Sequence, residues 1–185
     1  MKRLRAAVLV LTVLLVAQSA PALAQDKGDV GISMGYPASV GVVFHLTESV
    51  ALRPEISFTR ISSDSDSAFG DLSTDNYTYE IGISGLLYVG RWDKLRAYVT
   101  PGYAYRRTGG SNDVSVFPEV GSTTVSGHNF QGSFGAQYSL HEKFSVFGEA
   151  GLRYFTQQTR SSFSNGGVDF RSFGSRGAVG VIFYF

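Results

Sequence analysis

A histidine, a serine and a carboxylate that lie close together along the chain are the residues of this sequence best suited to catalysis. Ser126 and His128 are two residues apart, so on a strand both point to one face, and Glu119 lies a few residues earlier. A histidine beside a serine, with a carboxylate orienting the ring, is the arrangement that activates serine for hydrolysis. His45 and His141 fall elsewhere, so the three histidines form no metal-binding cluster.

A second set of candidate functional residues consists of arginines and glutamates. They lie on the small and polar faces of segments in which apolar and polar residues alternate. Its members are Arg53, Glu55, Glu80, Arg96, Glu149, Arg153 and Arg176. If these positions face one interior, three carboxylates meet four guanidinium groups there. An unpaired charge is costly in a weakly hydrated interior, whereas bidentate arginine–carboxylate pairing satisfies both partners. The set predicts a structural plug, and exchange of partners around Glu80 and Glu149 would instead make a gated ion path.

The composition excludes several classes of site and partner. The 185 residues contain no cysteine, which excludes disulfides, thiolate catalysis and cysteine metal sites. Sixteen basic residues stand against 15 acidic ones, so nothing indicates a nucleic-acid partner. We expect no cofactor and no metal. After the N-terminal region, no segment offers the roughly 18 consecutive apolar residues of a membrane helix.

Residues 1–24 have the features of a secretory leader. Residues 1–5 are basic, residues 6–17 are apolar, and Ala22-Leu23-Ala24 forms a small-x-small cleavage site. We therefore expect the leader to be cleaved, leaving one domain over residues 25–185. An uncleaved anchor is the alternative, but the apolar stretch is shorter than the roughly 20 residues that a spanning helix needs.

Eight segments of the remaining chain alternate apolar residues with small or polar ones, which is the period of a β-strand with one apolar face. They span residues 30–36, 40–46, 50–59, 77–89, 95–106, 129–138, 144–154 and 176–185. Such alternation fits a soluble sandwich with one wet face as well as a barrel with a lipid-facing side.

The connections between the segments decide between these folds. The links at 46–49, 90–94 and 140–143 are short and polar. The links at 62–75, 108–124 and 159–169 are long and rich in Ser, Gly, Asp and Asn, so we expect loops there. Short turns at one end and long loops at the other are typical of a transmembrane barrel.

In hydrocarbon an unpaired backbone group costs several kcal/mol, so an open sheet edge is not tolerated and the first and last strands must pair. We therefore predict an all-β fold, an eight-stranded antiparallel up-and-down transmembrane β-barrel. Pro54 and Pro101 fall inside predicted strands and cannot donate to the ladder, so we expect β-bulges there.

The chain ends with a glycine, Gly180, followed by two alternating aromatic residues, Phe183 and Phe185. With this terminus and its alternating segments, the sequence resembles the small eight-stranded outer-membrane barrels of the OmpA transmembrane-domain, OmpX and Ail kind, and is similar to porin-family β-barrel domains. The resemblance implies a bacterial outer-membrane location and a side-chain-filled interior. It also implies that the terminus is an assembly signal for the barrel-assembly machinery, although Ala178 stands where the family usually has a polar residue.

Residues at the two predicted membrane boundaries form aromatic girdles and a basic rim, since amphipathic rings favour interfaces. One girdle contains Tyr88, Trp92, Phe144, Phe183 and Phe185, and the other contains Tyr77, Tyr79, Tyr105 and Tyr154. The arginines expected at the outer rim are Arg60, Arg106, Arg107, Arg160 and Arg171. There they would contact outer-membrane lipid and the phosphates of lipopolysaccharide, or remain solvated.

Three non-enzymatic functions agree with this fold. They are envelope structure, adhesion to a host or surface ligand through the loops, and a narrow porin-like conductance of small solutes. An acidic loop at 62–75 beside an apolar one at 108–124 suits adhesion, because functional residues favour loops on a rigid scaffold.

A lipid A-modifying hydrolase is the less favoured alternative. The lipid A deacylase family carries its nucleophile two residues after the histidine, whereas His128 is followed by Asn129-Phe130. We therefore predict a non-enzymatic barrel with a plugged interior that serves envelope structure, adhesion or both.

Overall fold

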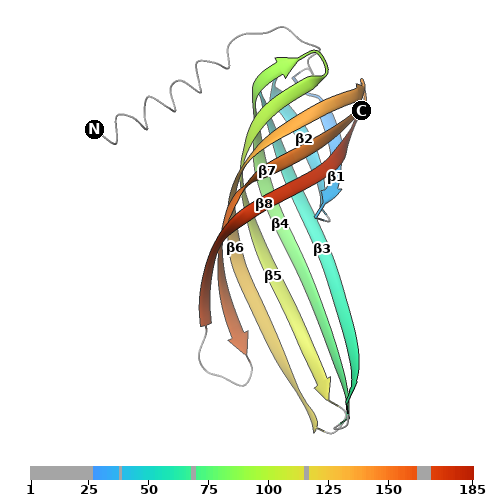
Figure 1. Ribbon diagram of the computed structural model, residues 1–185, viewed down its shortest axis with the longest axis vertical. Helices are drawn as coiled ribbons and strands as arrows, with labels where there is room; N and C mark the ends of the chain where they lie inside the picture. Colours follow the sequence, from blue (N-terminus) through green and yellow to red (C-terminus); the bar gives the residue numbers. More distant parts are fainter. Residues whose placement is uncertain (1–26, 38, 68–69, 115–116, 162–167) are drawn as a thin grey trace, which may run out of the picture.

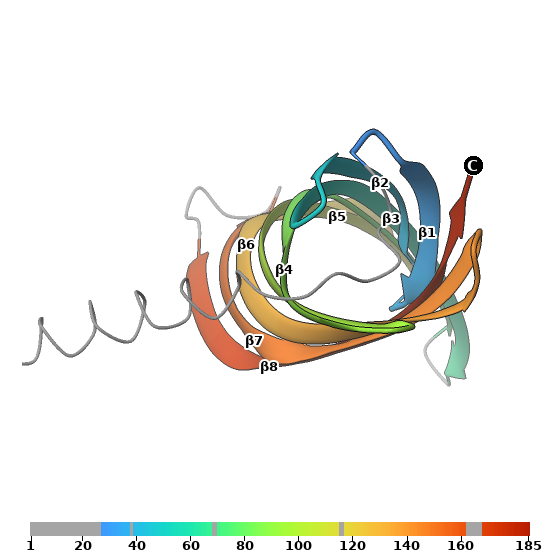
Figure 2. The same cartoon turned by 90° about the horizontal axis from the view of Figure 1, so that it is seen from above.

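The computed structural model describes residues 27–37, 39–67, 70–114, 117–161 and 168–185. Its eight strands form one closed antiparallel barrel in which β8 returns to pair with β1 (Figures 1 and 2). The strands are β1 (Val30–Tyr36), β2 (Ser39–Thr47), β3 (Val50–Ser67), β4 (Gly70–Trp92), β5 (Leu95–Val114), β6 (Phe117–His141), β7 (Phe144–Ser161) and β8 (Val168–Tyr184). The predicted eight-stranded barrel is confirmed, while the expected leader lies outside the described residues.

Three two-residue turns join the strands at one end of the barrel, which we call the short-turn end. They are Glu48-Ser49, Asp93-Lys94 and Glu142-Lys143, inside the links that the sequence predicts. Asp93 has a φ of 41°, a left-handed conformation that aspartate tolerates better than most residues. Across the described ranges, no helix is long and apolar enough to cross a membrane.

The barrel closes through regular pairing between β1 and β8. Their register runs from Gly31 opposite Tyr184 to Tyr36 opposite Val179. This pairing leaves no open edge in the part of the barrel that β1 covers, as the cost of unpaired backbone in hydrocarbon requires.

Large apolar side chains point outward on alternate positions of the strands. Ile81, Ile83 and Leu87 are exposed on β4, and Phe130 and Phe134 are exposed on β6. Residues between them, including Ser84 and Ser133, are buried inside the barrel. This arrangement is the reverse of a soluble protein and gives the barrel an apolar outer wall.

Two of the predicted loops are instead continuous strands, so the loop prediction is wrong there. β3 and β4 stay paired up to Ser67 opposite Gly70, and β5 and β6 stay paired up to Val114 opposite Phe117. Ser, Gly and Asp are poor strand formers alone, but each strand here pairs with a neighbour of similar length. In the third link, β7 runs to Ser161 and β8 begins at Val168, while residues 162–167 lie outside the described ranges.

The predicted β-bulges at Pro54 and Pro101 are absent from the ladders. Pairing of β2 with β3 keeps one register on both sides of Pro54, with two residue pairs missing from the ladder between. Pairing of β4 with β5 shows the same gap at Pro101. A missing N–H therefore weakens one ladder locally without displacing the strand. The register shifts lie beside the connections between strands instead, as between His45 and Thr47.

β1 and β2 are much shorter than the other strands, so the barrel wall extends less far there. β1 and β2 have seven and nine residues, whereas β3 to β6 have 18 to 25. Residues 57–67 of β3 are paired with β4 alone, and residues 168–178 of β8 with β7 alone. We call the gap above the β1–β2 hairpin, between these two edges, the notch. Figure 1 shows β3 to β6 extending far beyond the β1–β2 hairpin, toward the bottom of the view. We call this end of the barrel, where the β3–β4 and β5–β6 hairpins lie, the hairpin end, and "above" means toward it.

Candidate functional site

An ion cluster centred on Glu149 of β7 crosses the middle of the lumen. The Glu149 carboxylate lies 2.8 Å from Nη1 of Arg53 and 2.8 Å from Nη1 of Arg176, and it accepts a 3.0 Å hydrogen bond from the Tyr98 hydroxyl. The side chains of Glu149 and Arg53 are 0% and 2% exposed. β3 and β7 lie opposite each other in the ring, so the Arg53–Glu149 pair joins facing walls.

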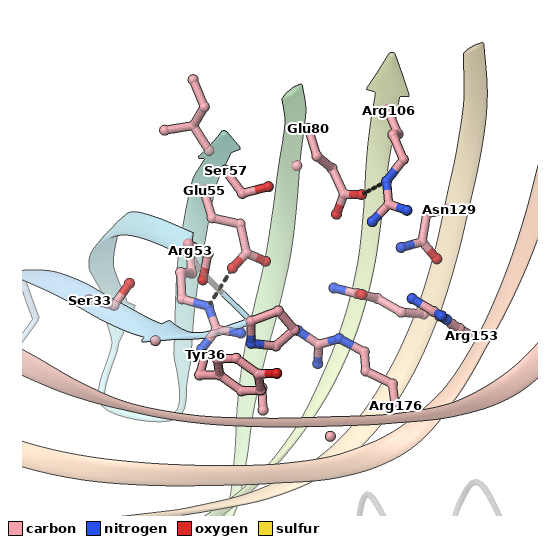
Figure 3. A pocket seen from close by; sticks show the side chains of 18 of the residues that line it. Ser33, Tyr36, Arg53, Glu55, Ser57, Glu80, Arg106, Asn129, Arg153 and Arg176 are labelled. Carbon is pink, nitrogen blue, oxygen red and sulfur yellow. Dashed lines mark hydrogen bonds and ion pairs between the residues drawn. The ribbon is translucent and has the colours of Figure 1, made fainter. Parts of the chain in front are cut away.

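Two further carboxylates extend this cluster toward the hairpin end. Glu55 lies 3.8 Å from Nε of Arg53 and accepts a 2.9 Å hydrogen bond from Ser84. Glu80 accepts a 2.7 Å hydrogen bond from Nε of Arg106 (Figure 3). Arg106 was expected at the outer rim, and this location is wrong, because the residue shares the inward strand face and its guanidinium meets Glu80 inside the lumen.

The remaining two arginines of the predicted interior set occupy different levels. Arg153 of β7 extends into the upper lumen and is exposed, and no described residue forms an ion pair or hydrogen bond with its side chain. Arg96 of β5 is 5% exposed and lies at the short-turn end, with its guanidinium 5.9 Å from the centre of the Tyr88 ring. The structure thus places five of the seven predicted residues in ion pairs of the middle lumen, with Arg153 above them and Arg96 below.

Below the ion cluster, an aromatic layer fills the lumen at the short-turn end. Tyr88 donates to Gln137 at 3.1 Å, and Gln137 donates to Tyr184 at 3.1 Å. The His45 ring stacks on Tyr88 with centroids 5.6 Å apart, and Tyr98 meets Tyr88 edge-on at 5.6 Å. All these rings are buried, so the lower lumen is packed with side chains rather than open.

The sequence predicted this layer only in part. Tyr88 was expected in the periplasmic aromatic girdle with Trp92, which is wrong because Tyr88 lies inside the barrel at 4% exposure. Tyr98 and Phe147 lie between polar residues of the inward face, and strict two-residue counting from Arg96 or Glu149 places both inside. Trp92, Phe183 and Phe185 are exposed, as the girdle requires.

A polar cavity of about 300 Å³ lies above the ion cluster, and we call it the vestibule (Figure 3). Its lining includes Arg106, Arg153, Arg176, Asn129 and Gln131, together with residues of the β1–β2 turn. Arg53 and Phe147 also line it. Because these two residues belong to the packed layers, the vestibule ends at the plug.

The other predicted rim residues lie at the hairpin end or outside the described side chains. Arg60 makes a 2.6 Å ion pair with Asp75, and its hydrogen bonds lower the pKa of the Asp75 carboxyl. Arg107 and Arg171 are exposed. The side chain of Arg160 lies outside the description. Contact of these arginines with lipopolysaccharide remains a prediction.

The terminal residues have a structural role that the geometry defines. Gly180 pairs with Gly35 of β1 and with Phe147 of β7. A Cβ atom at position 180 would lie 2.6 Å from Phe147 Cζ and closer still to the backbone oxygen of Met34. The rings of Phe183 and Phe144 pack in a tilted arrangement with centroids 4.8 Å apart. Glycine is therefore required where the ring closes, and recognition of this end by the assembly machinery remains a prediction.

The candidate catalytic histidine lies on the outer wall. Nδ1 of His128 is 2.8 Å from the Tyr103 hydroxyl, and the ring contacts Tyr105. No contact with Ser126 is recorded among the described residues, and the Glu119 side chain lies outside the description. Nor do any three histidine, aspartate or glutamate side chains converge on a metal site within the described ranges.

Most of the chain matches a known protein family. The sequence model of the family described as "outer membrane protein beta-barrel domain" matches residues 8–183. The chain belongs to this family. The protein is therefore an outer membrane β-barrel of bacteria, with an apolar outer wall that meets lipid. No curated protein matches the sequence significantly.

Solved structures support the fold of this outer membrane barrel. A major outer membrane protein from Thermus thermophilus is 11% identical, with a TM-score of 0.59 over 85% of this chain and 98% of that one. CarO of Acinetobacter baumannii is 15% identical, with a TM-score of 0.47 over 86% and 98%. Ail of Yersinia pestis is 11% identical, with a TM-score of 0.44 over 85% and 94%. The first of these shows a shared fold, and the other two scores are too low to carry an argument.

Proposed function

We propose that this protein is a non-enzymatic outer-membrane anchor that presents a rigid, protruding sheet for adhesion to a surface or host ligand. The single observation that carries this proposal is the height of β3 to β6, which continue as paired strands well beyond the β1–β2 hairpin. Short turns of outer-membrane barrels face the periplasm, so the sheet extends to the cell exterior.

The packed lumen supports an anchoring role over transport. Arg53, Glu149 and Tyr98 are buried in the middle of the barrel, and the aromatic layer lies directly beneath them. Ion pairs between facing walls resist deformation of the ring, which holds the protruding strands in a fixed orientation. Rigid presentation lowers the entropic cost of binding.

The free edge of β3 supplies a chemical means of capture. Residues 57–67 have paired backbone on the β4 side and no strand partner among the described residues on the other side. An exposed edge of this kind can accept an extended segment of another protein as an added strand. The exposed side chains of Ser62 and Ser63 keep this edge hydrated until a partner displaces water.

Introducing a proline on this edge of β3 provides the test. Pro54 interrupts the ladder on the β2 side of β3, so the backbone nitrogen of this residue faces away from β4. Backbone N–H groups two residues apart point to the same side of a strand. Ser62 lies an even number of residues from Pro54, so its N–H also points away from β4. We expect Ser62→Pro to remove a donor from the free edge while β3–β4 pairing is kept. A non-adherent bacterial strain that produces this variant should bind cultured epithelial cells no better than the strain without the protein.

Ser62→Ala is the matched control, because it removes the side-chain hydrogen bond to Asp75 and keeps the backbone N–H. This control should adhere like the wild type at equal surface abundance. The proposal fails if the wild-type protein confers no adherence, or if Ser62→Pro adheres as well as Ser62→Ala.

A further inference from the structure

The vestibule has an excess of positive charge. Of the residues that line it, Arg53, Arg106, Arg153 and Arg176 are cationic, and Glu55 and Glu80 are anionic. Glu149, just below, is shared between Arg53 and Arg176. Four guanidinium groups thus face three carboxylates, which leaves one surplus positive charge at the vestibule.

Arg153 is the cation without a matching carboxylate among the described residues. Arg106 is held by Glu80, and Arg176 by Glu149 and by the Ser133 hydroxyl at 3.2 Å. Arg153 has no ion pair or hydrogen bond with any residue of the described ranges and directs its side chain into the vestibule (Figure 3). Its donors are therefore available to a bound anion, together with the donors of Arg106 and Arg176 that face the cavity.

Asn129 adds a buried group to the same wall. It is 4% exposed, it lines the vestibule, and its side-chain oxygen has no hydrogen-bond partner within the described part of the chain. The amide nitrogen of Asn129 lies on the cavity side of the side chain (Figure 3) and carries two N–H donors. A ligand with several acceptor oxygens could accept hydrogen bonds from this residue and Arg153 together.

The notch gives a ligand two routes to this wall. Tyr36 and Pro37 of the β1–β2 turn line the vestibule, as do Ile56 and Ser57 of β3 and Ser175 to Ala178 of β8. These residues border the notch on its three sides. β1 has only seven residues, fewer than the roughly 9–11 that a strand needs to cross the hydrocarbon layer. The notch therefore begins at about the level of the outer-leaflet headgroups, where water can hydrate its free strand edges, and it opens to the external water beyond them.

We propose that the vestibule is a binding site for a phosphate-bearing anion, held by Arg153 with Arg106, Arg176 and Asn129. Guanidinium groups bind phosphate oxygens through paired, charge-assisted hydrogen bonds, and three of them around one cavity suit a group with several acceptor oxygens. A cavity of about 300 Å³ accommodates a phosphate group with part of the molecule that carries it. Because the plug closes the floor, the anion binds and leaves from the same side.

Titration calorimetry with inorganic phosphate, in octyl glucoside micelles at low ionic strength, tests this site. The wild-type protein should bind phosphate saturably, and Arg153→Gln should weaken binding about tenfold or more, as expected for the loss of a charged hydrogen-bond donor. Arg107→Gln is the matched control, since Arg107 is an exposed arginine on the outer wall of β5 and does not line the vestibule. It should bind phosphate like the wild type.

Glu80→Gln gives a change in the opposite direction. It removes the carboxylate that holds Arg106 and so should strengthen phosphate binding, whereas general damage to the barrel would weaken it. The proposal is overturned if the wild type shows no saturable heat with phosphate, if Arg107→Gln weakens binding as much as Arg153→Gln, or if Glu80→Gln fails to strengthen it.

A second titration distinguishes the two sources of the phosphate group. Dihexanoyl phosphatidic acid carries the same group on short acyl chains. Binding tighter than that of inorganic phosphate, and equally sensitive to Arg153→Gln, supports a lipid headgroup that enters through the notch. Equal affinities support a phosphate solute that enters from the external water. Phosphatidic acid that binds Arg153→Gln as tightly as the wild type would contradict the site.

Discussion

Replacing Glu149 by glutamine is expected to lower the free energy of unfolding by about 3–5 kcal/mol, the usual cost of removing one partner from a buried ion pair. Glutamine has the same shape but no charge, so Arg53 would keep its charge at 2% exposure without its 2.8 Å partner. Arg176 and Tyr98 would lose part of the same network. Denaturant unfolding in lipid vesicles, followed by Trp92 fluorescence, measures the loss.

Glu142→Gln is the control, because Glu142 is an exposed residue of a short turn. It should change stability by less than about 0.5 kcal/mol. A double-variant cycle adds a sharper criterion: Arg53→Met with Glu149→Leu should be more stable than the sum of the single changes predicts, since no unpaired charge remains. A loss below about 1 kcal/mol for Glu149→Gln would contradict the role of this cluster.

Replacing Gly180 by alanine is the second change with a large expected effect. The added Cβ would lie 2.6 Å from Phe147 and would overlap the Met34 backbone oxygen on β1. Overpacking of this kind costs about 1–3 kcal/mol, and more where backbone cannot move aside. Because β8 closes the ring against β1, we expect slower refolding from urea into vesicles and a lower midpoint of unfolding.

Gly148→Ala provides the comparison for this prediction. Gly148 is adjacent to Phe147 on β7, and a Cβ there would meet nothing within 4 Å. It should refold like the wild type. Refolding into vesicles contains no assembly machinery, so a normal yield for Gly180→Ala would contradict the packing role and leave only a role in recognition.

Strand number and strand faces could be predicted from sequence because a barrel wall enforces a strict period of two. Outward residues such as Ile81 and Phe134 and inward residues such as Ser84 follow it throughout the membrane-facing part. The two-residue turns were also predictable, since polar residues such as Asp93 and Lys94 interrupt the alternation. Closure between β1 and β8 follows from the cost of an open edge.

The partners inside the lumen could not be predicted in the same way. Alternation gives the face of a residue but not its height, which depends on how far each strand is displaced along its neighbours. Arg96 and Arg53 share an inward face, yet Arg53 meets Glu149 while Arg96 lies lower, against Tyr88. The same displacement brings Arg106 to Glu80.

The protruding strands were missed because composition and pairing point in opposite directions there. Residues 62–75 are rich in serine and aspartate, which usually indicate a loop. In the structure, β3 and β4 remain in register from Val50 to Ser67. Outside the membrane both faces meet water, so the alternation that marks a strand disappears although the backbone pairing continues.

Single-channel recording in planar lipid bilayers tests the central claim that the lumen is plugged. The Arg53–Glu149 pair joins facing walls, and the rings of Tyr88 and Tyr98 fill the space beneath it. We expect the wild-type protein to insert without discrete conductance steps. Reproducible steps of fixed size from the wild-type protein would contradict the plug and would favour a channel through the barrel.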